Sequence, residues 1–152
     1  MNMRRLRKLV ATLLLSVMSF NIFADGTVVS PGQQATVTIA PNGVPIVNIN
    51  APNAGISVTN FQEFNVGANG EVINNADNTG RSYVAGLIPG NPNYGPNQAA
   101  QLIILQVNGS NRSTIEGYLE VLSRSKPNLI LSNSNGITVN GGGTIGIANF
   151  TA

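Results

Sequence analysis

Residues 126–143, KPNLILSNSNGITVNGGG, constrain the fold of this chain more than any other stretch. Two apolar runs of three residues, at 129–131 and 137–139, are each followed by a corner rich in asparagine and glycine, and a third run begins at Thr144. Asparagine and glycine tolerate the positive φ of sharp turns, so such corners delimit very short strands. Strand-sized runs separated only by turns are typical of a coil of a parallel β-solenoid, in which asparagine side chains stack between coils. A meander of hairpins is the alternative, because periodicity alone does not separate the two.

The wider segment 121–143, VLSRSKPNLILSNSNGITVNGGG, resembles the core of the N-terminal secretion domain of filamentous-haemagglutinin-like exoproteins, the two-partner secretion family. That family carries two motifs, Asn-Pro-Asn-Leu and Asn-Pro-Asn-Gly-Ile. This chain has both in that order, with Tyr94 in place of the leucine and Ser134 in place of the second proline. The resemblance covers roughly residues 44–143. The positions that it singles out, either as turn residues or as contacts for a transporter, are Asn91, Pro92, Asn93, Tyr94, Asn133, Asn135, Gly136 and Ile137.

The resemblance implies an all-β fold, a right-handed single-stranded parallel β-helix whose first coil is capped by N-terminal strands. The sequence supports two such strands, because apolar and polar residues alternate at 35–39 and the run VPIVNIN follows at 44–50. We expect almost no helix after residue 24. Family members continue for several coils beyond the position of residue 143, so we also expect the β-helix to be incomplete at its C-terminal end.

The pattern between these strands and the first motif is less regular. Phe64 and Val66 are expected to point into one interior, and Glu71 begins another predicted strand. Residues 75–95 are rich in Asn, Gly and Pro, which predicts a loop with one short strand around 83–88.

Two later segments fit both a helix and strands. Residues 98–107 are bounded by Pro-Asn and Asn-Gly pairs, and these boundaries together with the family resemblance favour a strand. Residues 111–122 are predicted to form strand-turn-strand, because Gly117 interrupts the helical alternative. Glu116 and Glu120 are expected to face solvent.

The N-terminal segment has the layout of a secretory signal. Residues 1–8 are basic, residues 9–23 form an apolar run, and Ile22-Phe23-Ala24 ends in a small residue. We predict cleavage between Ala24 and Asp25, which leaves a signal peptide at 1–24 and a secretion domain at 25–152. An uncleaved membrane anchor and a buried amphipathic helix are the alternatives, but the run is short for a span of about 20 residues.

Composition argues against several other functions. The whole chain has a pI of about 9.4, yet residues 25–152 contain four basic and six acidic residues, a net charge of −2. The predicted mature chain therefore lacks the basic surface that nucleic-acid binding requires. The sequence has no cysteine and no histidine, which rules out disulfides and thiolate or histidine chemistry. We predict no enzymatic activity, no metal site and no cofactor.

The resemblance implies a function in export from a Gram-negative bacterium. We expect the secretion domain of an adhesin-like exoprotein, recognised in the periplasm by the periplasmic domains of an outer-membrane β-barrel transporter and then released to the cell surface. A passenger beyond the domain would bind a host-cell receptor or glycan. The strands from Thr27 to Asn50 are the expected contact because they emerge first, and the candidate early recognition strand among them contains Val44, Ile46, Val47 and Ile49. An independent carbohydrate-binding or structural solenoid module, and a gene fragment without function, are the alternatives.

Overall fold

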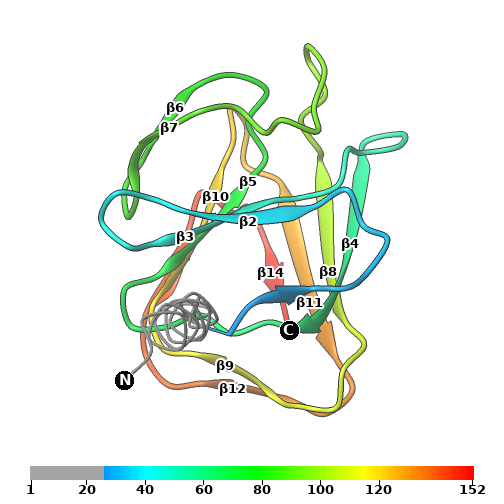
Figure 1. The fold of residues 1–152 in the computed structure, drawn as a ribbon, viewed down its shortest axis with the longest axis vertical. Coiled ribbons are helices and arrows are strands. Elements are labelled where there is room, and N and C mark those ends of the chain that lie inside the picture. The colour runs from blue at the N-terminus through cyan, green and yellow to red at the C-terminus, as the bar shows by residue number, and fades with distance from the viewer. Residues whose placement is uncertain (1–25) are drawn as a thin grey trace, which may run out of the picture.

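The computed structural model describes residues 26–152, so the predicted signal peptide and its cleavage site, Ala24 and Asp25, lie outside the described residues. Every regular element of the described part is a β-strand, and no helix there is long and apolar enough to cross a membrane. The strands wind into a β-helix (Figure 1). In chain order they are β1 (Val28–Val29), β2 (Thr36–Ile39), β3 (Pro45–Asn48), β4 (Ile56–Glu63), β5 (Glu71–Asn74), β6 (Gly80–Ser82), β7 (Gly86–Ile88), β8 (Leu102–Val107), β9 (Ser113–Ile115), β10 (Tyr118–Leu122), β11 (Asn128–Asn133), β12 (Ile137–Val139), β13 (Gly143–Ile145) and β14 (Phe150–Thr151).

Three faces make up the β-helix. The first sheet has the order β1-β4-β8-β11-β14, the second has the order β13-β10-β5-β3-β2, and β9 pairs with β12 on the third face. Pairing from one coil to the next is parallel throughout, so β3-β4, β5-β8-β9 and β10-β11-β12 are successive coils. The prediction of an all-β parallel β-helix is confirmed, and the alternative of a meander is wrong.

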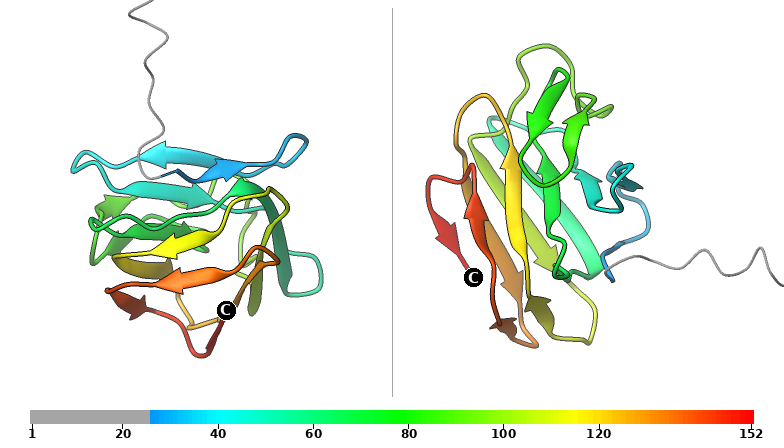
Figure 2. Two further views of the ribbon diagram at one scale, coloured as in Figure 1. Left: turned by 90° about the horizontal axis from the view of Figure 1, so that it is seen from below. Right: turned by 90° about the vertical axis from the view of Figure 1, so that its left-hand side faces the viewer.

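Antiparallel strands cap the N-terminal end. β1 pairs with β4 and β2 pairs with β3, which covers the outer edge of the first coil on both sheets. Figure 2 shows these blue strands at one end of the stack and the red C-terminal strands at the other. Because an uncovered edge strand presents unpaired backbone groups, the cap protects the fold from pairing with other chains. The predicted capping strands are confirmed.

The interior is filled by side chains that stack in register from coil to coil. Each inward position of the first sheet packs on the same position of the neighbouring coil, which removes apolar surface from water. Phe64 and Val66 are buried there as predicted, and the Phe64 ring meets that of Phe61 edge to face at 5.2 Å. Two of the columns are Ser57, Ile103 and Leu129, and Thr59, Leu105 and Leu131.

A hairpin outside the coils covers part of the second sheet. β6 and β7 pair in antiparallel fashion, and Ala85 and Ile88 pack against Ile46 and Val72 on the outer face of that sheet. The short strand predicted around 83–88 is present as β7, but its partner β6 and the hairpin that the two strands form were not predicted. The strand predicted for 98–107 is present but begins only at Leu102.

The hairpin also overturns the expectation for Glu120. This side chain lies on the outer face of β10, yet it is only 2% exposed because residues 82–84 cover it. Its carboxylate accepts hydrogen bonds from Ser82 Oγ at 2.6 Å and from the Tyr83 and Val84 backbone nitrogens. Glu120 therefore anchors the hairpin, whereas Glu116 is exposed as expected.

The glycine run at 141–143 forms a corner where coils approach closely. A Cβ atom on Gly142 would lie 2.0 Å from the Gly117 carbonyl oxygen, and one on Gly117 would lie 2.2 Å from the Gly67 carbonyl oxygen. Neither position has room for a side chain, because the backbones of successive coils touch here.

Candidate functional site

The first motif forms a tight turn on the loop that precedes β8. Asn91 Oδ1 accepts a hydrogen bond of 2.9 Å from the Asn93 nitrogen, and the Tyr94 nitrogen donates to the Asn91 carbonyl oxygen at 3.0 Å. Pro92 occupies the second position, where its fixed φ suits a turn. The side chain of Asn91 thus supports the turn from inside.

The amides of this motif bind two coils at once. Asn91 is buried, and its Nδ2 donates to the carbonyl oxygens of Ile49 at 2.9 Å and Asn74 at 2.8 Å. Asn93 Nδ2 donates to the carbonyl oxygens of Asn48 and Ile49. These acceptors end β3 and β5, where the ladder of the second sheet stops, so the motif satisfies backbone groups that the sheet leaves open.

The second motif repeats the geometry between β11 and β12. Asn133 Oδ1 accepts from the Asn135 nitrogen at 2.9 Å, and the Gly136 nitrogen donates to the Asn133 carbonyl oxygen at 3.0 Å. Ser134 takes the place of proline without altering this pattern, and Gly136 supplies a φ of +98°. The two motifs are therefore equivalent turns at different corners of the β-helix.

The second motif also binds the preceding coil. Asn133 Nδ2 donates to Ser113 Oγ at 2.9 Å and to the Asn111 carbonyl oxygen, and Asn135 Nδ2 donates to the Gly109 carbonyl oxygen at 2.7 Å. Ile137 follows at the start of β12 and packs, half-buried, against the core. Asn133 and Asn135 are also only partly covered, unlike Asn91.

Sequence reasoning missed an amide on which the first motif depends. Asn75 is fully buried, its Nδ2 donates to the Ala100 carbonyl oxygen and to Ser123 Oγ, and its Oδ1 accepts from the Ala100 nitrogen. The Tyr94 hydroxyl donates to the same Oδ1. Burial raises the pKa of this hydroxyl above its ordinary value, and the Ser57 side chain lowers it by a smaller amount.

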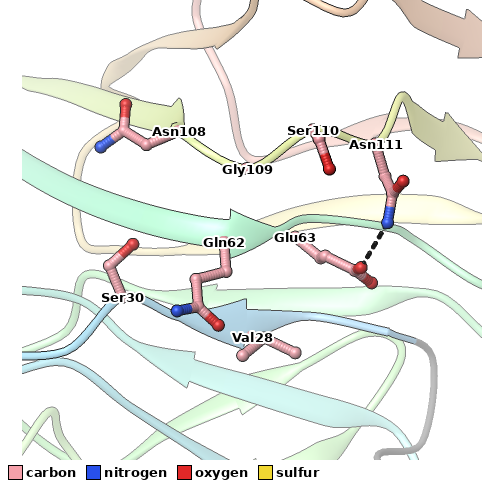
Figure 3. A pocket seen from close by; sticks show the side chains of 8 residues that line it. All are labelled: Val28, Ser30, Gln62, Glu63, Asn108, Gly109, Ser110 and Asn111. Carbon is pink, nitrogen blue, oxygen red and sulfur yellow. Dashed lines mark hydrogen bonds between the residues drawn. The ribbon is translucent and has the colours of Figure 1, made fainter.

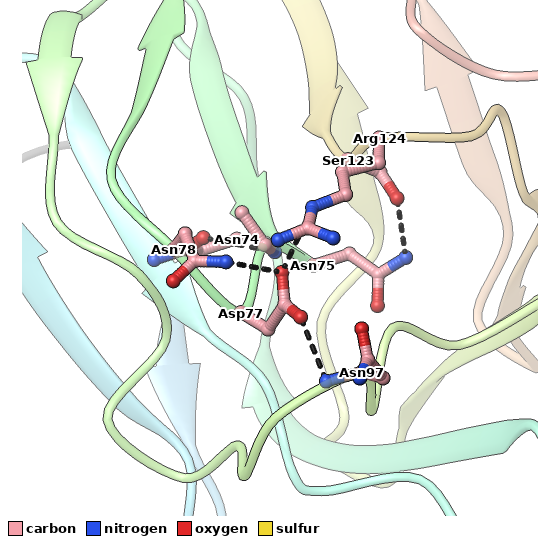
Figure 4. A network of polar contacts seen from close by, with 8 residues as sticks. Asn74, Asn75, Asp77, Asn78, Asn97, Ser123 and Arg124 are labelled. Carbon is pink, nitrogen blue, oxygen red and sulfur yellow. Dashed lines mark hydrogen bonds and ion pairs between the residues drawn. The ribbon is translucent and has the colours of Figure 1, made fainter.

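A charged network lies beside Asn75 (Figure 4). Asp77 Oδ1 pairs with Arg124 Nε at 3.3 Å, and Asp77 Oδ2 accepts a hydrogen bond from the Asn97 nitrogen at 2.8 Å. Asn97 has a positive φ of 55° just after the first motif. Asp77 and Asn97 lie at the two ends of the loop that contains the first motif. The network therefore holds both ends of this loop against Arg124, in the turn that follows β10. Asp77 and Arg124 carried no signal in the sequence, because the contact joins residues far apart in the chain.

The candidate recognition strand is inaccessible in the folded domain. Val47 and Ile49 point into the interior, while Val44 and Ile46 lie under the hairpin, and all four are buried. β3 pairs with β2 on one side and with β5 on the other, so its main chain is covered as well. The first motif contacts the end of this strand, because Asn91 and Asn93 both donate to the Ile49 carbonyl oxygen.

A polar groove of about 640 Å³ lies between β1, the end of β4 and the loop after β8 (Figure 3). Asn111 Nδ2 donates to Glu63 Oε1 across it at 2.6 Å. None of the sequence-predicted site residues lines the groove. Within residues 26–152, no group of three or more His, Cys, Asp or Glu side chains is placed to hold a metal ion.

Comparisons with known proteins point to one family. A model of the TPS secretion domain family matches residues 21–152. The 16S rRNA endonuclease CdiA of Enterobacter cloacae subsp. cloacae is 42% identical over 125 residues, which cover 81% of this chain and 4% of that protein. The hemolysin of Proteus mirabilis is 40% identical over 140 residues, or 91% of this chain and 9% of that protein. The crystal structure of the filamentous hemagglutinin secretion domain matches with a TM-score of 0.75 and 38% identity, over 82% of this chain and 41% of that one.

The capped β-helix places the chain in a class of secretion domains. This chain belongs to the TPS secretion domain family. The resemblance noted from the two motifs is confirmed. An independent solenoid module is not favoured. The chain spans only 4% and 9% of the lengths of these two curated relatives.

Proposed function

We propose that the domain is exported by two-partner secretion, through an outer-membrane β-barrel transporter with periplasmic domains. We propose further that this transporter recognises the domain before it folds, and that it binds the segment around β3. In the folded domain both the side chains and the main chain of this segment are covered. In an extended chain, Val44, Ile46, Val47 and Ile49 offer an apolar strand that can add to the sheet edge of a periplasmic domain. The complete burial of this strand is the observation that carries the proposal.

The proposal includes processing on export. Removal of residues 1–24 between Ala24 and Asp25 would release the domain into the periplasm, where the transporter meets it. The basic start, the apolar run and the small residue at position 24 support this step. Mass spectrometry of the exported chain checks it, and a mass that includes Met1 would contradict it.

The asparagine motifs act later, when the domain folds outside the cell. Their amides bind carbonyl groups of the neighbouring coil, so these bonds exist only once two coils have stacked. Each coil in turn offers an edge for the next, and folding of successive coils can draw the chain outward without another energy source. The motifs thus fix the folded shape rather than the first contact.

A receptor or glycan would be bound by sequence beyond this domain. The curated relatives are many times longer than the part that this chain matches, which supports a role for the domain as one part of a longer exoprotein.

Binding of the unfolded chain to the periplasmic domains of the cognate transporter tests the proposal. Ile46→Asp places a charge in the recognition strand and is expected to weaken binding at least about tenfold, the factor that 1.4 kcal/mol represents. Leu87→Asp is the matched control, because it also replaces an aliphatic side chain with a carboxylate but lies outside the recognition strand. Asn135→Ala is expected to leave binding unchanged. Loss of binding in Asn135→Ala together with normal binding in Ile46→Asp would reverse the assignment.

A further inference from the structure

Five asparagines of the chain are followed directly by glycine, and this pair of residues is chemically labile. The backbone nitrogen of the glycine can attack the side-chain carbonyl carbon of the asparagine, because glycine has no side chain to block the approach. The reaction requires a glycine nitrogen without a hydrogen bond and a turn that can change its shape. The five asparagines are Asn42, Asn69, Asn108, Asn135 and Asn140.

The folded structure restrains four of these pairs. Three of the glycine nitrogens donate to a carbonyl oxygen three residues earlier in the chain, at 2.8 to 3.0 Å, namely those of Gly43, Gly70 and Gly136. Each of these hydrogen bonds has to break before the nitrogen can react. The fourth glycine, Gly109, packs directly against the Gln62 carbonyl oxygen, and its own carbonyl oxygen accepts a 2.7 Å hydrogen bond from Asn135 Nδ2. Its turn is therefore also fixed.

The corner at Asn140 lacks these restraints. Within residues 26–152, neither the Gly141 nitrogen nor the Asn140 side chain has a hydrogen-bond partner, and both residues are exposed. The corner joins β12 to β13, and in the described chain each of these is an edge strand of its sheet. Segments with few internal bonds open at a low cost in free energy. Asn140 thus combines a free glycine nitrogen with a corner that can rearrange.

We propose that Asn140 deamidates spontaneously in the folded domain, faster than the other four asparagines that precede glycine. The Gly141 nitrogen gives up its proton and bonds to Cγ of Asn140, the bond from Cγ to Nδ2 breaks, and ammonia leaves with that proton. Water then opens the succinimide ring that has formed. Cleavage of the bond between the nitrogen and Cγ gives aspartate, and cleavage between the nitrogen and the main-chain carbonyl carbon gives isoaspartate.

The two products differ in their effect on the fold. Aspartate leaves the main chain unchanged and adds only a charge at an exposed position. In isoaspartate the main chain runs through Cβ and Cγ, so it gains an extra carbon atom between β12 and β13. β13 pairs with β10 in a fixed register, with Gly143 opposite Tyr118. The extra atom disturbs this register, so the isoaspartate product loosens β13.

Reaction rates in the folded and the denatured chain test the proposal. The purified chain is incubated in mildly alkaline buffer, either folded or in guanidinium chloride, and each asparagine is followed by peptide mass spectrometry with fragmentation. In denaturant all five should react at similar rates, because glycine follows each of them. On folding, Asn140 should keep most of its rate while the other four slow at least tenfold, the factor that about 1.4 kcal/mol of opening free energy represents. Another pair that reacts as fast as Asn140 in the folded chain, or an Asn140 that slows as much as the rest, would overturn the proposal.

Two variants test the assignment and its consequence. Asn140→Gln should lose the product at this position, because glutamine would have to form a larger ring, and a product that persists would overturn the assignment. Asn140→Asp carries the aspartate product alone and is the matched control for the isoaspartate form, which is separated by chromatography from aged wild-type chain. The isoaspartate form should exchange the backbone hydrogens of β13 faster than Asn140→Asp. Equal exchange in the two would overturn the loosening of β13.

Discussion

The hydroxyl of Tyr94 donates a 2.8 Å hydrogen bond to Oδ1 of Asn75, a fully buried amide. Tyr94 stands where the family motif has leucine, and its ring still packs against the core. Asn75 also binds Ser123, which follows β10 in the next coil. The departure from the motif therefore adds a polar link between the first turn and a later coil.

Removal of this hydroxyl should destabilise the domain. Tyr94→Phe keeps the ring but takes one hydrogen-bond donor away from a buried acceptor, which costs about 1 kcal/mol of unfolding free energy. Urea unfolding of the exported chain measures the change. Tyr83→Phe, at a position that is 87% exposed, should leave the unfolding curve unchanged. A Tyr94→Phe variant as stable as the wild type would show that the bond contributes nothing.

The Tyr94 hydroxyl should also make the stability of the folded domain fall at high pH. Burial raises the pKa of Tyr94 above its ordinary value of 10.0, so the unfolded chain loses this proton first. The stabilisation is complete below about pH 10 and is lost as pH rises from there toward the higher pKa of the folded chain. The urea midpoint of the wild type should therefore fall more steeply above about pH 10 than that of Tyr94→Phe. Parallel pH curves for the two proteins would contradict the expected burial of the hydroxyl.

Asn91 should tolerate substitution less well than an exposed asparagine. Asn91→Asp keeps the size of the side chain but replaces the Nδ2 donor with an oxygen that faces the carbonyl oxygens of Ile49 and Asn74. Leaving these acceptors unpaired beside a buried charge should cost at least about 2 kcal/mol of unfolding free energy. Asn140→Asp, at an exposed site between β12 and β13, serves as the control in urea unfolding. Equal stability of the two variants would refute the role of Asn91 as a bond between coils.

Glu120 should control the protection of the hairpin. Glu120→Ala removes the acceptor for Ser82 and for the Tyr83 nitrogen, so trypsin should cut after Arg81 faster than in the wild type. Limited proteolysis followed by mass spectrometry identifies the cut. Glu116→Ala, four positions earlier and exposed, should leave the rate unchanged. Faster cutting in both variants would point to general loosening instead of a local anchor.

Much of the coil structure could be predicted from the sequence, because each short strand is followed directly in the chain by the turn residues that end it. The runs in 126–143 become β11, β12 and β13 in the predicted order, since Asn and Gly corners end each strand within a few residues. The hairpin and the burial of Glu120 could not be predicted in this way. The bond from Ser82 to Glu120 joins positions 38 residues apart, and no periodicity in either segment records it.

The candidate site, too, could be predicted from the sequence only in part. The resemblance picked out Asn91 and Asn133, but their partners are largely main-chain carbonyl groups, which any residue type provides. Asn75 was missed because a single polar residue at a strand end looks like a surface position. Only the fold reveals that its side chain is enclosed.

The most direct test of the account compares the affinity of the transporter's periplasmic domains for this chain in its folded and unfolded states. The exported chain is presented either folded or freshly diluted from urea, at the same final urea concentration, and binding is followed before refolding. Because β3 is covered on both faces and both edges in the folded domain, we predict binding by the unfolded chain and little or none by the folded one. Equal or tighter binding by the folded domain would contradict recognition before folding.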